Sequence, residues 1–116
     1  MVFTPVWTPV AQETYVELKA KAEASLKARL RGQKTKATRD EGLFKQVYKC
    51  IQHLLQNPRH HGLATHAYRS LTNPYDKNEK VFEAYAQNDT PGAYRVFWCY
   101  GPDRAQITII AITPHP

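Results

Sequence analysis

The first half of the chain carries apolar side chains at helical spacing. Between residues 9 and 31 these positions are sparse and alanine-rich, which predicts a helix that packs along a narrow stripe and is exposed elsewhere. Thr8 followed by a proline is typical of a helix start, because the hydroxyl caps the first turn and proline needs no hydrogen-bond acceptor there. Gly32 is expected to end the helix, and a basic loop over residues 32–39 follows it.

A second and stronger helical pattern lies between residues 40 and 56. Asp40 is the predicted N-cap. Asn57-Pro58 is expected to stop the helix, because the residue before a proline avoids helical backbone angles. The apolar positions follow the i, i+3, i+4, i+7 spacing of an amphipathic helix; they are Phe44, Val47, Tyr48, Ile51, Leu54 and Leu55.

Runs of β-branched and aromatic residues, separated by Gly, Pro, Asn and Asp, predict β-strands in the rest of the chain. The N-terminal run contains Pro5 and suits an edge strand, because proline cannot donate a hydrogen bond to a neighbouring strand. Both alternating faces of residues 93–100 are apolar apart from Arg95, which favours a central strand. The predicted strands are 2–7, 64–71, 80–88, 93–100 and 105–113.

The predicted order of elements is β-α-α-β-β-β-β, within a single domain over residues 1–116. This order favours an α+β fold in which a helical hairpin packs on one face of a four- to five-stranded antiparallel sheet. The last two strands are expected to form a hairpin at the centre of that sheet. If Pro102 and Asp103 make the turn, Arg95 lies opposite Ile110.

Composition narrows the protein class. No run of residues is apolar and long enough to cross a membrane, and the first residues lack the features of a secretory signal, so a cytoplasmic protein is expected. Cys50 and Cys99 lie far apart, without metal-ligand spacing and within predicted regular elements, which favours buried, reduced thiols.

Charge is unevenly distributed along the chain. The net charge is +6, but residues 19–49 alone hold ten Lys or Arg and three acidic residues, so this stretch carries +7 and the remainder −1. A basic region on a neutral body suits a polyanionic partner such as RNA. The alternative is a solvated helix face with an exposed loop.

Arg95 is the one charged residue within the predicted central strand. A guanidinium keeps its proton, and burying it without a partner costs several kcal/mol, on the order of the penalties known for buried charges. It must therefore meet a carboxylate, for which Glu83 on the preceding predicted strand is the candidate, or face an opening where an anion binds. The sequence leaves both alternatives open.

The five histidines do not indicate a metal site. His60 and His61 are adjacent and His66 is close in sequence, but adjacent histidines in a turn rarely converge on one ion. No cysteine or acidic residue stands at ligand spacing. Neither a metal nor another cofactor is expected.

The chain resembles the RelE/ParE toxin superfamily over nearly its whole length. The resemblance begins with the short strand and helix start in FTPVWTP and continues through HGLATHAYRSL. It is best in GAYRVFWCYGPDRAQITIIAITPHP, which is similar to the family's arginine-bearing strand, tight turn, final strand and polar tail. Tyr68 and Ser70 depart from the leucine and glycine that are commoner in the family.

The resemblance implies a toxin of a type II toxin–antitoxin system, with a cognate antitoxin as partner. Many members are ribosome-dependent mRNA endoribonucleases that direct the ribose 2′-OH onto the adjacent phosphate without a metal, and others inhibit DNA gyrase. By this resemblance Arg95 would bind the scissile phosphate, and His115 and His66 would transfer protons.

The resemblance implies further site residues without assigning each of them a definite role. The tail lacks the tyrosine that often accompanies the terminal histidine, and Tyr85, Tyr94 and Tyr100 are open as replacements. A non-catalytic binder or gyrase inhibitor on the same fold is the alternative function. The expected contacts to mRNA or rRNA are Lys27, Arg29, Arg31, Lys34, Lys36, Arg39 and Arg69.

Overall fold

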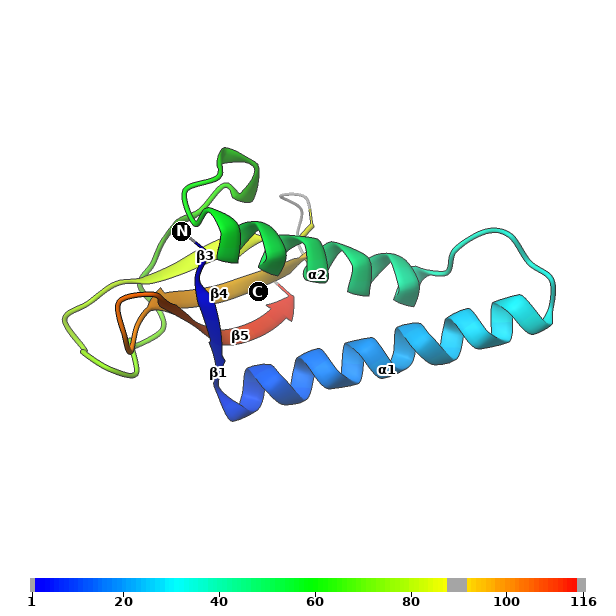
Figure 1. Cartoon of the computed structure of the whole chain (residues 1–116), viewed down its shortest axis with the longest axis horizontal. Helices are drawn as coiled ribbons and strands as arrows, with labels where there is room; N and C mark the ends of the chain where they lie inside the picture. Colours follow the sequence, from blue (N-terminus) through cyan, green and yellow to red (C-terminus); the bar gives the residue numbers. More distant parts are fainter. Residues whose placement is uncertain (1, 88–91, 115–116) are drawn as a thin grey trace.

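The computed structural model describes residues 2–87 and 92–114. Two long helices lie against one side of a twisted β-sheet, in the element order that the sequence predicts (Figure 1). The elements are β1 (Thr4–Trp7), α1 (Pro9–Arg31), α2 (Arg39–Gln56), the short 3-10 helix η1 (His61–Leu63), β2 (His66–Tyr68), β3 (Val81–Tyr85), β4 (Tyr94–Tyr100) and β5 (Gln106–Pro114).

The sheet has five strands in the order β1-β5-β4-β3-β2, so β4 is central as predicted. The sheet is mixed, which corrects the prediction of a purely antiparallel one, because β1 pairs with β5 in parallel. The other three pairings are antiparallel. Parallel strands need a long crossover connection. The chain between β1 and β5, which holds both long helices and the other three strands, provides it. Pro5 sits on the edge strand, where its missing N–H costs no ladder hydrogen bond.

The β4–β5 hairpin differs in register from the prediction. Arg95 pairs with Thr113, not with Ile110. The connection from Gly101 to Ala105 is longer than a two-residue turn, and a β-bulge opposite Phe97 and Trp98 adds one residue to β5. The bulge is anchored to the helical layer, because the Thr8 hydroxyl donates a 2.7 Å hydrogen bond to the carbonyl of Ile110.

The caps of the helices explain their limits. Thr8 accepts a hydrogen bond from the backbone N–H of Ala11, and Gly32 follows the last residue of α1, as predicted. The predicted N-cap of α2 was wrong. Thr38 and Glu41 form a capping box, in which each side chain accepts a backbone N–H from the other residue, and Asp40 lies in the first turn.

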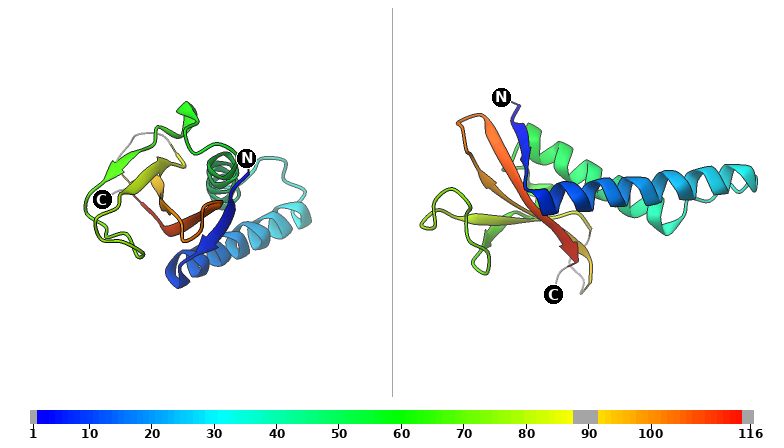
Figure 2. Two further views of the ribbon diagram at one scale, coloured as in Figure 1. Left: turned by 60° about the vertical axis from the view of Figure 1, so that its left-hand side comes forward. Right: turned by 90° about the horizontal axis from the view of Figure 1, so that it is seen from below.

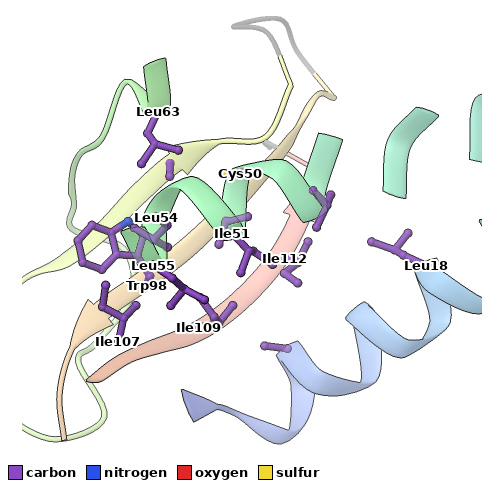
Figure 3. Close-up of a cluster of buried hydrophobic side chains, with 14 residues drawn as sticks. Leu18, Cys50, Ile51, Leu54, Leu55, Leu63, Trp98, Ile107, Ile109 and Ile112 are labelled. Carbon is purple, nitrogen blue, oxygen red and sulfur yellow. The ribbon is translucent and has the colours of Figure 1, made fainter. Parts of the chain in front are cut away.

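The hydrophobic core lies between the sheet and the adjoining parts of both helices (Figure 3). The last three turns of α2 bury the deepest helical residues, including Leu54, against Trp98 and Ile109 of the two central strands. Cys50 and Cys99 are both buried and reduced, and burial raises the pKa of Cys50 to about 12 and that of Cys99 to about 11. Among the described residues, none of the helices combines the length and apolarity needed to span a bilayer.

The far part of the helical hairpin extends beyond the sheet. This hairpin arm, residues 23–42, contains no buried residue although the structure describes all of it. It makes the molecule elongated, with extents of 51 × 27 × 25 Å (Figure 1; Figure 2, right). The two helices are tied there by a hydroxyl contact between Ser25 and Thr38 and by an ion pair between Arg29 and Glu41.

Candidate functional site

Arg95 is fully buried on the sheet face that points away from the helices. Its side chain is 0% exposed, and its Nε donates a 3.2 Å hydrogen bond to Oε1 of Glu83, which is 1% exposed. Its Nη1 donates to the carbonyls of Ala93 and Tyr94 at 3.1 and 3.3 Å. The Tyr85 ring covers the guanidinium, with 4.0 Å between Cζ and the ring centroid. Every one of these contacts stabilises the charge inside the protein.

These contacts decide between the two alternatives that the sequence leaves open for Arg95. A buried ion pair is tolerated when good geometry and further hydrogen bonds offset desolvation, and Arg95 has both. The guanidinium therefore meets an internal carboxylate in this conformation, and it is not presented to an anion in solvent.

His66 stands at the surface of the same cluster. It pairs with Glu83 in the β2–β3 register, and its Nε2 lies 3.9 Å from Oε2 of Glu83. Its Nδ1 donates to the carbonyl of Ala64 at 3.1 Å, so Nε2 is the proton acceptor in the neutral ring. The His66 side chain is 49% exposed and meets the edge of Tyr85 at 5.7 Å between ring centroids. The cluster thus combines a half-exposed imidazole with a buried carboxylate that lies close to its Nε2.

The other predicted site residues are His115 and three candidate tyrosines, and the tyrosines lie on different faces of the sheet. His115 lies outside the described residues. Tyr85 is on the same sheet face as Arg95 and contacts both it and His66. Tyr94 packs against the hydrophobic core on the opposite face, and Tyr100 makes an edge-to-face contact with Trp98 there. Of the three tyrosines left open by the sequence, Tyr85 is the one that joins the cluster.

The predicted RNA contacts fall into two groups. Arg69 is exposed just after β2, whereas the others belong to the hairpin arm. Arg29 is engaged within the arm: it contacts both oxygens of Glu41 at 2.8–3.1 Å and the carbonyls of Lys34 and Thr35. Five other basic residues of the arm are exposed: Lys27, Arg31, Lys34, Lys36 and Arg39.

Sequence reasoning missed Glu41 and left Tyr85 as one of three candidate tyrosines, although a simple signal distinguishes each of them. Glu41 stands three residues after Thr38, the spacing of a capping box, and this predicts both the helix start and a fixed carboxylate for Arg29. Tyr85 is two residues after Glu83, so period-two alternation places both on the face of the sheet that Arg95 occupies. Within the described part of the chain, no three His, Cys, Asp or Glu side chains are grouped to hold a metal ion.

Comparisons with known proteins support the fold. No protein-family model matches the chain, and no curated protein sequence does. Among solved structures, the chain is similar to a YoeB dimer from Staphylococcus aureus, with a TM-score of 0.57 and 12% sequence identity over all of both chains. At this identity the likeness establishes an α+β architecture shared with YoeB, and it covers the chain from end to end.

Proposed function

We propose that this chain is the toxin-type component of a type II toxin–antitoxin pair and that it binds ribosome-associated RNA in the cytoplasm. The observation that carries the proposal is the hairpin arm. Five exposed basic side chains gather on a projection that adds nothing to the core. Such a projection is suited to the phosphate backbone, since cations held away from the protein body can follow a groove of a structured RNA.

Binding is proposed ahead of cleavage because of the state of Arg95. An arginine that stabilises a scissile phosphate must reach it, and here Glu83 and Tyr85 enclose the guanidinium. This state of Arg95 favours binding over cleavage, and the fold, which YoeB shares, suits an antitoxin partner. Exposed apolar residues along α1 offer that partner a surface; they are Val16, Leu26 and Leu30.

Cleavage of the bound RNA is the second candidate function, and the exposed His66 beside Glu83 favours it. In this reaction the 2′-oxygen attacks the adjacent phosphorus, its proton passes to His66, and the bond from phosphorus to the 5′-oxygen breaks. A general acid, for which His115 is the candidate, protonates the leaving oxygen, and a 2′,3′-cyclic phosphate remains. Arg95 would stabilise the phosphorane only after Glu83 released it.

The arm is tested with two triple variants of equal charge change. The first, Arg31→Gln with Lys34→Gln and Lys36→Gln, removes cations from the arm. The control, Lys77→Gln with Lys80→Gln and Arg104→Gln, removes three exposed cations elsewhere. We expect the arm variant alone to weaken binding to ribosomes and to lower the log–log salt slope by about one unit for each lost phosphate contact. Equal losses in both variants would contradict the proposal.

Expression in cells distinguishes RNA binding from RNA cleavage. On induction of the wild type, growth arrest with new mRNA 5′ ends that disappear in His66→Gln and His115→Gln would establish cleavage. Arrest without new ends, lost in the arm variant, is the result expected for a binder. A well-folded, abundant protein that causes no arrest would refute the toxin function.

A further inference from the structure

A hollow of about 410 Å³ lies on the helix side of the sheet, away from the Arg95 cluster. It is enclosed by the segment that follows α2 and by the outer parts of β3 and β4. Its size falls within the range of about 300–1,000 Å³ that is usual for small-ligand pockets. The residues that bear on its chemistry are Arg59, His60, Thr65, Phe82, Trp98 and Tyr100.

Flat rings dominate the walls of this hollow. Phe82 stacks on Trp98 with 4.7 Å between ring centroids and 26° between planes. On the other wall His60 stacks on His61 at 5.1 Å and 9°. Gly62 allows this arrangement, because a Cβ there would lie 2.9 Å from the His60 ring. Trp98 itself is 1% exposed, so a ligand in the hollow meets the Phe82 ring and the two imidazoles. Proteins hold unstacked nucleobases on faces of this kind.

Two buried polar atoms in these walls have no hydrogen-bond partner among the described residues. They are the indole Nε1 of Trp98, whose side chain is 1% exposed, and the hydroxyl of Thr65. Figure 3 draws the indole nitrogen on the ring edge nearer Leu63, the end of η1. Both atoms have almost no accessible surface, so a ligand would reach them only after a side-chain shift, and hydrogen-bond acceptors on its edge would then satisfy both groups.

The charge of the walls selects an anion. Arg59 is exposed at the rim, and none of the described residues that line the hollow is Asp or Glu. The Nδ1 of His60 accepts a 3.0 Å hydrogen bond from the N–H of Gly62, so its Nε2 carries the proton and is a second donor. Cationic and neutral donors therefore stand at the mouth of an aromatic pocket.

We propose that this hollow binds a single nucleotide unit, with the base between the aromatic walls and the phosphate at Arg59. Trp98 Nε1 and the Thr65 hydroxyl would read the edge of the base. The unit can be a free nucleotide or one residue of single-stranded RNA. The inference does not depend on the proposed function, because neither the hairpin arm nor Arg95 lines the hollow.

The test uses the intrinsic fluorescence of Trp98. The chain contains two tryptophans, so in Trp7→Phe the signal comes from the pocket alone. Each of the four ribonucleoside monophosphates, the matching nucleosides, inorganic phosphate and short single-stranded RNA are titrated in turn. We expect saturable quenching by at least one monophosphate. In Arg59→Gln the affinity for this monophosphate should fall about tenfold or more, whereas the affinity for the matching nucleoside should change little.

Two further variants locate the binding. Trp98→Phe keeps a ring but removes the indole N–H, and calorimetry should show weaker binding of the same monophosphate by about fivefold or more. Arg104→Gln is the matched control for Arg59→Gln and should bind as the parent does. Two results would overturn the single-nucleotide pocket. One is a protein that binds RNA but none of the monophosphates. The other is an unchanged affinity for the monophosphate in both Arg59→Gln and Trp98→Phe.

The RNA titration separates this inference from the proposed function. If Arg59→Gln weakens both monophosphate and RNA binding, the pocket takes a residue of an RNA strand. If it weakens the monophosphate alone, the ligand is a free nucleotide. No saturable signal with any probe, from a protein folded by circular dichroism, would overturn the pocket, whatever the arm variant does on ribosomes.

Discussion

Two arginine–glutamate pairs at opposite parts of the molecule have the same chemistry and different surroundings. Arg95 and Glu83 lie inside the sheet, with side chains 0% and 1% exposed. Arg29 and Glu41 lie in the hairpin arm, with side chains 16% and 13% exposed and a bidentate contact. The first pair is enclosed by strands and an aromatic ring, whereas the second bridges two helices that project into solvent.

The difference shows what each pair does for the protein. Water cannot replace a lost partner inside the sheet, so each member of the inner pair holds the other in place. In the arm the ion pair compensates for a missing core, because no buried apolar residue joins the helices there. Its effect is visible on Glu41: the hydrogen bond from Arg29, followed by the one from the Thr38 N–H, lowers the pKa of Glu41 from 4.5 to about 2.

Breaking the inner pair should have the largest effect on stability. Glu83→Gln preserves the shape of the side chain but removes the carboxylate that pairs with the buried Arg95. Removing one partner of a buried pair costs about 3–5 kcal/mol. We expect a loss of this size in the free energy of unfolding, measured by urea denaturation at pH 7.

A double replacement is the control for this effect. Glu83→Leu combined with Arg95→Met removes both charges and fills the space with apolar groups, which in other proteins is often neutral or stabilising. The double variant should therefore be more stable than Glu83→Gln. A small loss in Glu83→Gln, below about 1 kcal/mol, would mean that solvent reaches Arg95 and that the guanidinium is available to a phosphate.

Breaking the outer pair should open the arm and leave the sheet intact. Arg29→Gln removes the contacts to Glu41 and to the carbonyls of Lys34 and Thr35. We expect faster hydrogen exchange and proteolysis confined to residues 23–42, with a smaller shift of the urea midpoint than in Glu83→Gln. Lys27→Gln is the matched control, since Lys27 is exposed on the same helix. Faster exchange across β4 would contradict this local role.

The contrast between these regions also explains what the sequence could predict. Local signals sufficed where neighbours along the chain make the structure, as at the Thr8 cap, the Gly32 terminus and the two-faced strand β4. They named Glu83 as one of two alternatives for Arg95, because adjacent strands can bring the two residues together, but they did not decide between Glu83 and an anion in solvent. They also indicated the basic arm, although Arg29 could not be set apart from the other cations before its carboxylate was known.

Long-range geometry was beyond such signals. The parallel pairing of β1 with β5 joins residues about a hundred positions apart, and no local pattern encodes its direction. The bulge in β5 accepts a hydrogen bond from the Thr8 hydroxyl at the start of α1, about a hundred positions earlier in the chain. The longer connection shifts the register by two positions and the bulge by one more, so Arg95 pairs with Thr113 instead of Ile110. The hollow beside Trp98 needs three separate segments and has no sequence motif.

The arm should also lose stability in acid, through Glu41. Its pKa is lowered in the folded protein, so the carboxylate stabilises folding fully above about pH 4.5, its ordinary value, and this contribution is lost as the pH falls toward about 2. Wild type and Glu41→Gln should differ in urea midpoint at pH 6 and converge toward pH 2.5. A difference that is constant with pH would show that Glu41 acts through its shape and not its charge.

The smallest effect on stability is expected for a third ion pair, in which both side chains are exposed. Lys21 and Glu17 form an i, i+4 contact of 3.3 Å on α1, with side chains 58% and 61% exposed. Water solvates both groups in the folded and unfolded states, so Lys21→Gln should change the free energy of unfolding by no more than about 0.5 kcal/mol, and less at high salt. Urea denaturation at low and high ionic strength measures this. A loss comparable with that of Glu83→Gln would mean that burial is not what separates the three pairs, because the contact distances at Lys21 and Arg95 are nearly the same.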